Sequence, residues 1–191
     1  MRHAPIAAVL LALATTPVNA AFVFGRLTPP SAAEANGPSS AAEVSGDGRV
    51  FVFESGATNW VAGSITGGKI IAVDFGADSV QVLSTTSSGV AFNASSFAPS
   101  TAGGGRYVVF ETLANNLGLG VGTSGFQIVR KDRATGALTL ASASAAGQPA
   151  SGSASGQARN SSVSADGRFV SFRSDATNLL GESHRPEERV R

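Results

Sequence analysis

One stretch of this chain occurs three times. The third copy, residues 164–172, reads Ser-Ala-Asp-Gly-Arg-Phe-Val-Ser-Phe and closes with Ala-Thr-Asn-Leu at 176–179. The Gly-Arg pairs of the three copies begin at residues 48, 105 and 167, so the periods are 57 and 62 residues. An asparagine follows each of these glycines by 11 residues, at 59, 116 and 178. Constant spacing within the copies and variable spacing between them is typical of a structural repeat joined by loops of different length.

The repeat is defined by a turn glycine, the arginine that follows it and the closing asparagine, with an aspartate before the glycine in two of the copies. These residues are Asp47, Gly48, Arg49 and Asn59 in the first copy, Gly105, Arg106 and Asn116 in the second, and Asp166, Gly167, Arg168 and Asn178 in the third.

Each turn leads into a run of β-branched and aromatic residues, which is a strong signal for a tight turn and a strand. The predicted strands cover residues 49–53, 106–110 and 168–172. They are apolar at nearly every position instead of alternating, so we expect both faces of each strand to be buried. Phe53, Phe110 and Phe172 should occupy equivalent positions.

Further strands follow from the same comparison of copies. Two more strands are predicted after each turn strand, at 69–74 and 80–83 and at 127–132 and 138–140, and one before it, as at 95–98 and 161–164. Four short antiparallel strands per unit predict an all-β protein built of β-propeller blades. The blades are predicted at about 36–84, 94–142 and, incompletely, 160–191.

The number of blades is small for a closed ring. Propellers close with about 4 to 8 blades, whereas this chain carries two whole ones and part of a third. We therefore expect an incomplete, open propeller, either from a truncated reading frame, which we favour, or because another chain supplies blades. Its uncovered end sheets, with Val50, Val52, Phe169 and Val170, should make residues 21–191 poorly stable and prone to self-association.

The Ser-x-Asp-Gly-Arg strand, the Ala-Thr-Asn-Leu corner and the Asp-x-x-Thr-Gly turn at 132–136 resemble the TolB-like, WD-type β-propeller repeats of bacterial secreted proteins. The resemblance covers roughly residues 36–191. The second copy departs from it with Gly104 in place of the aspartate, and the first with Trp60 in place of the leucine. The resemblance implies a module that presents loops to protein partners at its rim and central channel.

Residues 1–20 have the pattern of a secretory signal peptide, with a short basic start, an apolar core and small residues before a cleavage point after Ala20. Residues 21–35 are predicted to hold one strand and a linker. We expect an exported protein, periplasmic or extracellular, without a membrane span, because the apolar run is shorter than the roughly 20 residues that a bilayer needs. Without cysteine it forms no disulfides.

Charge and side-chain chemistry exclude several functions. Removal of Arg2 leaves 13 basic and 13 acidic residues, which gives no electrostatic case for nucleic acid. The only histidine after residue 20 is His184, in a polar tail, so neither a Ser-His-Asp site nor a zinc site is predicted. We expect no cofactor and no catalytic activity.

The repeat residues themselves allow structural and functional interpretations. We interpret Asp47 and Asp166 as turn residues and not as calcium ligands, because Gly104 stands in their place in the second copy. Asparagines at 59, 116 and 178 suit backbone corners, with ligand lining as the alternative. Arginines at 49, 106 and 168 suit pairing with loop carbonyls and a nearby acid, such as Glu54 or Glu111; the alternative is a ring that binds an anionic partner.

Two functions from different classes fit these observations. The leading interpretation is an exported, non-catalytic propeller module that binds another protein or a ligand; the alternative is the scaffold or gating domain of an exported hydrolase whose catalytic part lies outside this chain. An adjoining domain with Ser, His and Asp would favour the second. A β-solenoid adhesin ranks last, because solenoid repeats are nearer about 20 to 30 residues. The Ser/Ala/Gly-rich residues 142–160 are expected to form a mobile surface loop.

Overall fold

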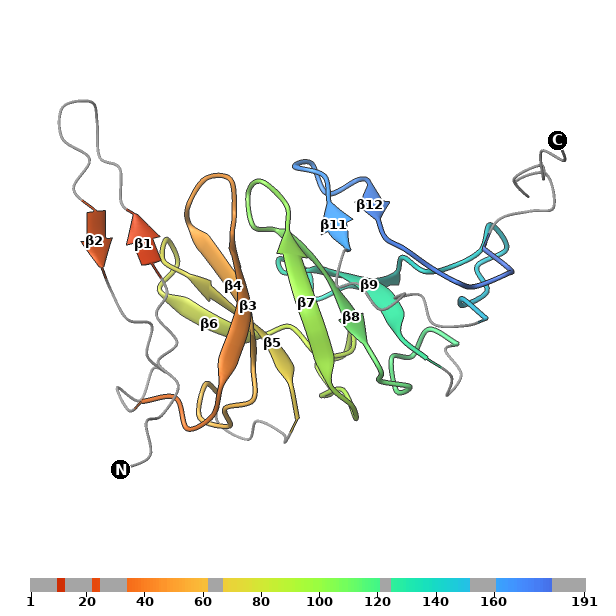
Figure 1. The fold of residues 1–191 in the computed structure, drawn as a ribbon, viewed down its shortest axis with the longest axis horizontal. Helices are drawn as coiled ribbons and strands as arrows, with labels where there is room; N and C mark the ends of the chain where they lie inside the picture. Colours follow the sequence, from red (N-terminus) through yellow and green to blue (C-terminus); the bar gives the residue numbers. More distant parts are fainter. Residues whose placement is uncertain are drawn as a thin grey trace, which may run out of the picture.

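The structure is a computed structural model that describes residues 10–12, 22–24, 34–61, 67–120, 125–151 and 161–179. Within these ranges the regular elements are all β-strands, and no helix occurs (Figure 1). The strands are β1 (Leu10–Ala12), β2 (Phe22–Phe24), β3 (Ser39–Val44), β4 (Val50–Ser55), β5 (Lys69–Asp74), β6 (Ser79–Val82), β7 (Ser96–Thr101), β8 (Tyr107–Thr112), β9 (Gln127–Asp132), β10 (Leu138–Leu140), β11 (Ser162–Val163) and β12 (Val170–Ser171).

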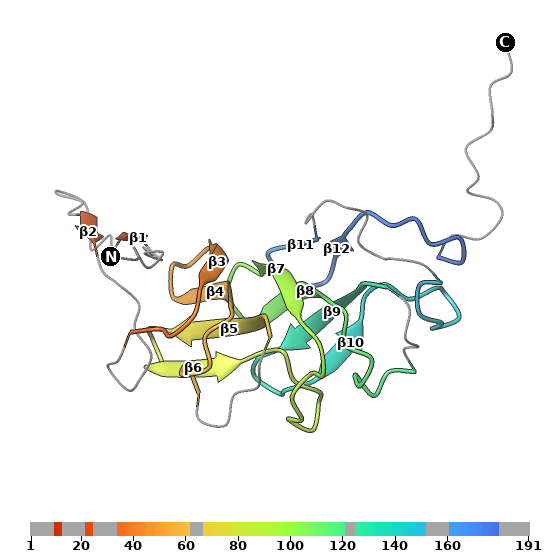
Figure 2. The same cartoon turned by 60° about the horizontal axis from the view of Figure 1, so that its bottom comes forward.

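Two four-stranded antiparallel sheets form the body of the molecule. The first has the order β3-β4-β5-β6, the second β10-β9-β8-β7, and the third repeat contributes the pair β11-β12. The first strands β3, β7 and β11 lie along one side of the row of sheets, and β6 and β10 lie along the other (Figure 2). None of the sheets closes into a barrel. This confirms the predicted fold class: blades of four antiparallel strands in an open, incomplete array.

At the N-terminal end, β1 pairs with β2 in an antiparallel register that joins Leu10 to Phe24. These two strands lie on either side of the predicted cleavage point after Ala20.

The registers of the two complete sheets are equivalent. Phe53 pairs with Ile71 in the first sheet, and Phe110 pairs with Val129 in the second. Both phenylalanines are buried, as predicted. The prediction of full burial is wrong for the third copy, in which Phe172 is only partly buried. The physical reason is that β12 pairs with β11 alone among the described residues, so its strand lies at the edge of a two-stranded pair.

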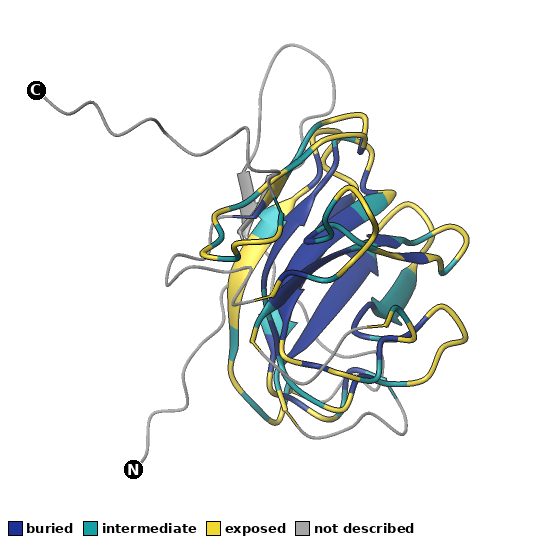
Figure 3. Cartoon of the chain, turned by 90° about the vertical axis from the view of Figure 1, so that its right-hand side faces the viewer, coloured by how far each residue is buried: buried dark blue, intermediate teal, exposed yellow. Residues whose placement is uncertain are grey.

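The main core lies between the first and second sheets. Val52, Ile70 and Ala72 of the first sheet pack against Phe110 and other residues of the second, and all are fully excluded from solvent (Figure 3). The members of this core are Val50, Val52, Ile70, Ala72, Leu83, Phe92, Val108, Phe110, Ala114, Leu117, Val129 and Leu138. Burial of this much apolar surface is the main stabilising contribution that one sheet makes to the next.

The prediction that Val50 and Val52 lie on an uncovered end is therefore wrong. Both side chains point toward the second sheet, where their exposed fractions are 2% and 0%. The opposite face of the first sheet carries Phe53, Trp60 and Ile71, which form a buried cluster of their own. Residues at the third copy, by contrast, do include an exposed apolar side chain: Phe169 is 66% exposed.

The turn glycines serve the contact between sheets as well as the turn. Gly105 and Gly167 have positive φ angles of 70° and 73°, which only glycine adopts without strain. A Cβ on Gly105 would lie 2.5 Å from Cβ of Val50, and one on Gly167 would lie 2.7 Å from Cγ of Tyr107. Val50 and Tyr107 are equivalent residues, so the same glycine-to-side-chain contact joins each repeat to the one before it.

Polar contacts also tie the second sheet to the first. Arg133 donates through Nε to Oε1 of Gln81 at 2.9 Å and through Nη2 to Oδ2 of Asp74 at 3.2 Å. Lys131 donates from Nζ to the carbonyl oxygens of Thr85 and Thr86, at 2.8 and 2.9 Å. Burial lowers the pKa of the Lys131 ammonium. These charge-assisted bonds satisfy cations that the junction between the sheets excludes from water.

The segments after the two sheets repeat as well, which corrects one prediction. Residues 142–151 were expected to belong to a mobile loop, yet Ser142 and Ala150 are buried and Ala143 bridges to Pro149. The Ser142 hydroxyl accepts the amide of Ile128 at 3.0 Å, as the Ser84 hydroxyl accepts the amide of Ile70 at 2.9 Å. This hairpin could not be predicted from the Ser/Ala/Gly-rich composition, because small side chains can pack onto a neighbouring sheet without a core of their own. Residues 152–160 lie outside the described ranges.

The glycine contact can be tested with a matched pair of substitutions. Gly105→Ala and Gly48→Ala both place a side chain at positive φ, which costs about 1–2 kcal/mol. Gly105→Ala also forces a methyl group against Val50, so its free energy of unfolding should fall by about 1–3 kcal/mol more. At Gly48, by contrast, an added Cβ would have no described heavy atom within 4 Å apart from those of Gly48 and its two chain neighbours.

Urea denaturation at low protein concentration measures both variants. Equal losses of stability would show that the contact between Gly105 and Val50 contributes nothing beyond the turn.

Candidate functional site

In the first and third repeated turns, the aspartate side chain accepts hydrogen bonds from residues of its own turn. Oδ1 of Asp166 accepts the Ser164 hydroxyl at 2.6 Å and the Arg168 amide at 3.1 Å, and Asp47 makes the equivalent bonds with Ser45 and Arg49. These bonds, the serine hydroxyl first, hold the pKa values of both carboxyls below their usual range. Each carboxylate is thus bonded to the hydroxyl and the amide of its own turn, the arrangement expected of a turn residue.

The three repeated asparagines make one and the same corner. Oδ1 of Asn116 accepts the amide of Asn93 at 3.1 Å, while its Nδ2 donates to the carbonyl of Ala91 at 2.9 Å. Asn59 and Asn178 bond in the same way to the segments that precede their own sheets, with Nδ2 donating to the Glu34 and Pro149 carbonyls. Each asparagine thus fastens the entry of its repeat to the corner after the second strand.

Sequence comparison missed the partners of these corners. Asn36 and Asn93 occupy equivalent positions, and each forms a reciprocal pair with the residue before the corner asparagine. Nδ2 of Asn93 donates to Oδ1 of Asn115 at 2.6 Å, and Nδ2 of Asn36 donates to Oγ1 of Thr58 at 2.8 Å. Both asparagines lie 23 residues before their corner asparagine (36 to 59 and 93 to 116), a signal that could have found them. In the third copy Ser151 takes this place.

The repeated arginines have different partners. Arg106 binds Asp132 through two bonds of 3.1 and 2.8 Å and lowers the pKa of that carboxyl to about 2. Arg168 pairs with Asp166 at 2.6 Å, and the Arg49 guanidinium lies against Gly76, where a Cβ would come 2.6 Å from Cζ. Asp132 is the acid beside Arg106, where Glu111 was expected. Each arginine thus makes these contacts within its own repeat.

One hollow lies along the first strands. Its volume is about 470 Å³, and it is lined by Ala41, Ala42, Glu43, Ala98, Pro99, Ser100, Ser161 and Ser162. These residues come from three successive repeats. Ala41 and Ala98 are equivalent, lie at bulges of β3 and β7, and have positive φ angles of 51° and 48°. A non-glycine residue at such angles is strained, and strain of this kind is concentrated at functional sites.

Glu43 is the charged residue of this hollow. Its Oε2 accepts the amide of Thr101 at 3.1 Å and its Oε1 accepts the hydroxyl of Ser100 at 3.4 Å, so it bridges the first strands of two sheets. Burial raises the pKa of the Glu43 carboxyl despite these bonds. The hollow therefore combines one half-buried carboxylate, serine hydroxyls and two strained strand edges.

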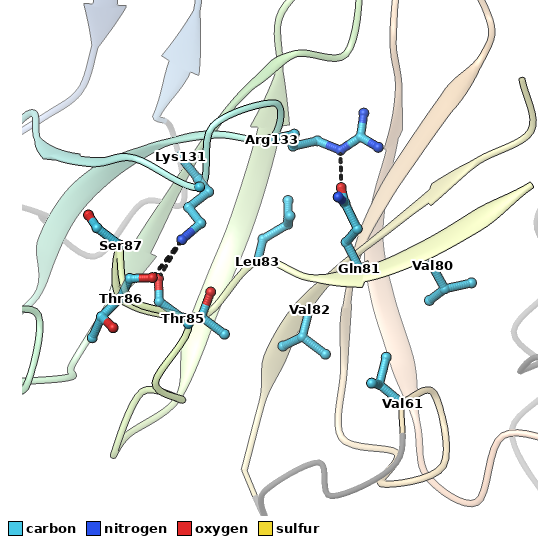
Figure 4. A pocket seen from close by; sticks show the side chains of 12 residues that line it. Val61, Val80, Gln81, Val82, Leu83, Thr85, Thr86, Ser87, Lys131 and Arg133 are labelled. Atoms are coloured by element: carbon cyan, nitrogen blue, oxygen red, sulfur yellow. Dashed lines mark hydrogen bonds between the residues drawn. The ribbon is translucent and has the colours of Figure 1, made fainter. Parts of the chain in front are cut away.

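A second hollow, of about 380 Å³, lies between the fourth strand of the first sheet and the second sheet (Figure 4). Val80, Val82 and Leu83 line it on one side, and Lys131 and Arg133 on the other. The dashed lines in Figure 4 show Arg133 bonded to Gln81 of the first sheet. They also show Lys131 bonded to the segment that follows this sheet, at Thr85 and Thr86. These side chains hold the sheets together, so the hollow along the first strands is the stronger candidate for binding.

Comparison with other proteins adds nothing to this geometry: no family model matches the sequence, and no curated protein matches it either. No group of three or more metal-ligating side chains occurs in the part of the chain that the structure describes. That part also offers no helix suited to crossing a membrane. His184 lies outside the described residues.

The corner asparagine predicts a defined loss of stability. Asn116→Ala removes two bonds and leaves the Asn93 amide and the Ala91 carbonyl without their partner, so the free energy of unfolding should fall by about 1–3 kcal/mol. Gln148→Ala, at an exposed position, is the control and should change it by less than about 0.5 kcal/mol. Thermal denaturation of both variants measures the difference. If the free energy of unfolding of Asn116→Ala equals that of the wild-type chain, the corner role is wrong and a ligand-lining role for this asparagine is favoured.

Proposed function

We propose that this chain is an exported, non-catalytic interaction module that binds another protein along the first strands of its sheets. The observation that carries the proposal is the bulge repeated at Ala41 and Ala98, where the backbone has positive φ angles. Both bulges line one hollow, to which three successive repeats contribute residues. The resemblance of the repeats to TolB-like propellers supports the same kind of function, since such modules present their surfaces to protein partners.

The chemistry of the hollow suits an extended segment of a partner. β3 and β7 are the edge strands of their sheets, and an edge strand offers backbone groups that pair with an added strand. The small, exposed side chains of Ala41 and Ala42 leave room for the partner backbone to approach β3. Glu43 would accept hydrogen bonds from an amine or guanidinium of the partner.

Binding is tested by filling the hollow. Proteins captured from the exported fraction of the producing cells are purified, and each is titrated against the wild-type chain and against Ala42→Tyr. The affinity of a true partner should fall at least about tenfold, or about 1.4 kcal/mol. Ala134→Tyr, at an exposed turn away from the hollow, is the matched control and should bind normally.

The proposal is wrong if no exported protein binds the wild-type chain, or if every one that binds does so equally well to Ala42→Tyr. Hydrolysis of a captured protein by the purified chain would instead favour an enzyme.

Export makes a separate prediction. In a secreting host the mature species should begin at Ala21, because the small residues before that position suit a signal peptidase. Intact-mass spectrometry of the exported protein measures this. An exported protein that retains Met1 would contradict the cleavage, and a protein that stays inside the secreting host would contradict the export.

A further inference from the structure

Equivalent residues of three repeats meet in the hollow along the first strands. Glu43, Ser100 and Ser162 each lie five residues before the glycine of their own turn, and Ser161 comes one residue before Ser162. All four residues line the hollow, because β7 lies between β3 and β11 (Figure 1). At the position that they share, the first repeat has a carboxylate and the other two have a serine. The repeat thus brings one negative charge and several hydroxyl groups together.

The Glu43 carboxylate has hydrogen-bonding capacity that the chain does not use. Oε1 accepts the Ser100 hydroxyl at 3.4 Å, and Oε2 accepts the Thr101 amide at 3.1 Å. An ionised carboxylate offers about four acceptor positions, so about one position on each oxygen remains open. Among the described residues, no lysine or arginine forms an ion pair with Glu43. Burial disfavours the charged form of this carboxyl, and a cation that entered the hollow would stabilise it.

Ser161 is a second polar group of the hollow with unused capacity. Only 9% of this residue is exposed, and its hydroxyl oxygen has no hydrogen-bond partner. A buried hydroxyl that bonds to nothing costs free energy, and a ligand that bonds to it would remove this cost. By contrast, the buried Ser100 hydroxyl donates to Glu43. Ser161 and Glu43 therefore both favour a ligand that carries several N–H donors and a positive charge.

We infer that this hollow binds an arginine side chain of the protein partner. A guanidinium is a planar fork whose N–H groups match both oxygens of one carboxylate, whereas an ammonium is a compact point charge without this fork. Glu43 accepts two N–H groups, one on each oxygen, and the Ser161 hydroxyl accepts a third. The inference rests on the proposed function, because the arginine belongs to the partner. The hollow itself can be probed without the partner.

A blocked arginine is the probe for the hollow. N-acetyl-arginine methylamide is titrated into the wild-type chain, and nuclear magnetic resonance follows the amides of Glu43, Ser100 and Thr101. These amides should shift saturably. The citrulline analogue has a neutral urea in place of the guanidinium and should bind at least about tenfold more weakly. N-acetyl-lysine methylamide should also bind more weakly than the arginine probe, because it lacks the fork.

Three variants assign the binding to individual groups. Glu43→Gln keeps the shape but removes the charge, so it should bind the arginine probe at least about tenfold more weakly and lose the preference over citrulline. Ser161→Ala should lower the affinity about three- to tenfold without loss of stability, since its hydroxyl has no partner in the free chain. Asp78→Asn removes a carboxylate at an exposed turn and should bind as the wild-type chain does.

Circular dichroism checks that each variant is folded. If Glu43→Gln is unfolded, Ser161→Ala and the citrulline analogue still decide the test.

Proteins captured in the Ala42→Tyr experiment separate this inference from the proposed function. A partner that Ala42→Tyr excludes should bind Glu43→Gln at least about tenfold more weakly than the wild-type chain. If such a partner binds Glu43→Gln normally, the proposed function stands and the arginine site is wrong. If no partner is captured, the proposed function is wrong, whereas saturable binding of the arginine probe would still support the site.

Three results with the probes would overturn the inference. The first is the absence of saturable shifts with the arginine probe. The second is equal or tighter binding of the citrulline or lysine compound. The third is an unchanged affinity of folded Glu43→Gln for the arginine probe.

Discussion

The packing of each sheet face against the next sheet is the interaction on which the rest of this structure depends. A four-stranded sheet of this size buries little apolar surface alone, and its stability comes from neighbours, as in other repeat proteins. Val52 and Ile70 on one side and Phe110 and Val129 on the other form a single core that belongs to both sheets. Arg133 and Lys131 are bonded across the same junction.

The repeat residues are explained by this constraint. Gly105 and Gly167 allow the turn and at the same time leave room for a side chain of the preceding repeat. The corner asparagines fix the entry of each repeat, so that successive sheets start from the same geometry. The hollow that we propose as the binding surface lies elsewhere, along the first strands with their bulges at Ala41 and Ala98.

Much of the fold could be predicted from the sequence, because the repeated glycines, arginines and asparagines mark the same turn and corner in each repeat. The strands at 69–74, 127–132 and 138–140 lie where the comparison of copies placed them. Which face of a strand meets which neighbour could not be predicted, because β4 is apolar on both faces; Val50 and Val52 were assigned to the wrong side for that reason. The hollow was not predicted either. The bulges at Ala41 and Ala98 depend on positive φ angles, and an alanine in the sequence gives no signal for such an angle.

Native-state hydrogen exchange tests most directly whether the two complete sheets form one unit with a shared core. The slowest amides of β4 and β5 and those of β8 and β9 should open with the same free energy and the same dependence on denaturant, because neither sheet keeps its buried face without the other. Separate opening of the two sheets, with clearly different free energies, would contradict the shared core.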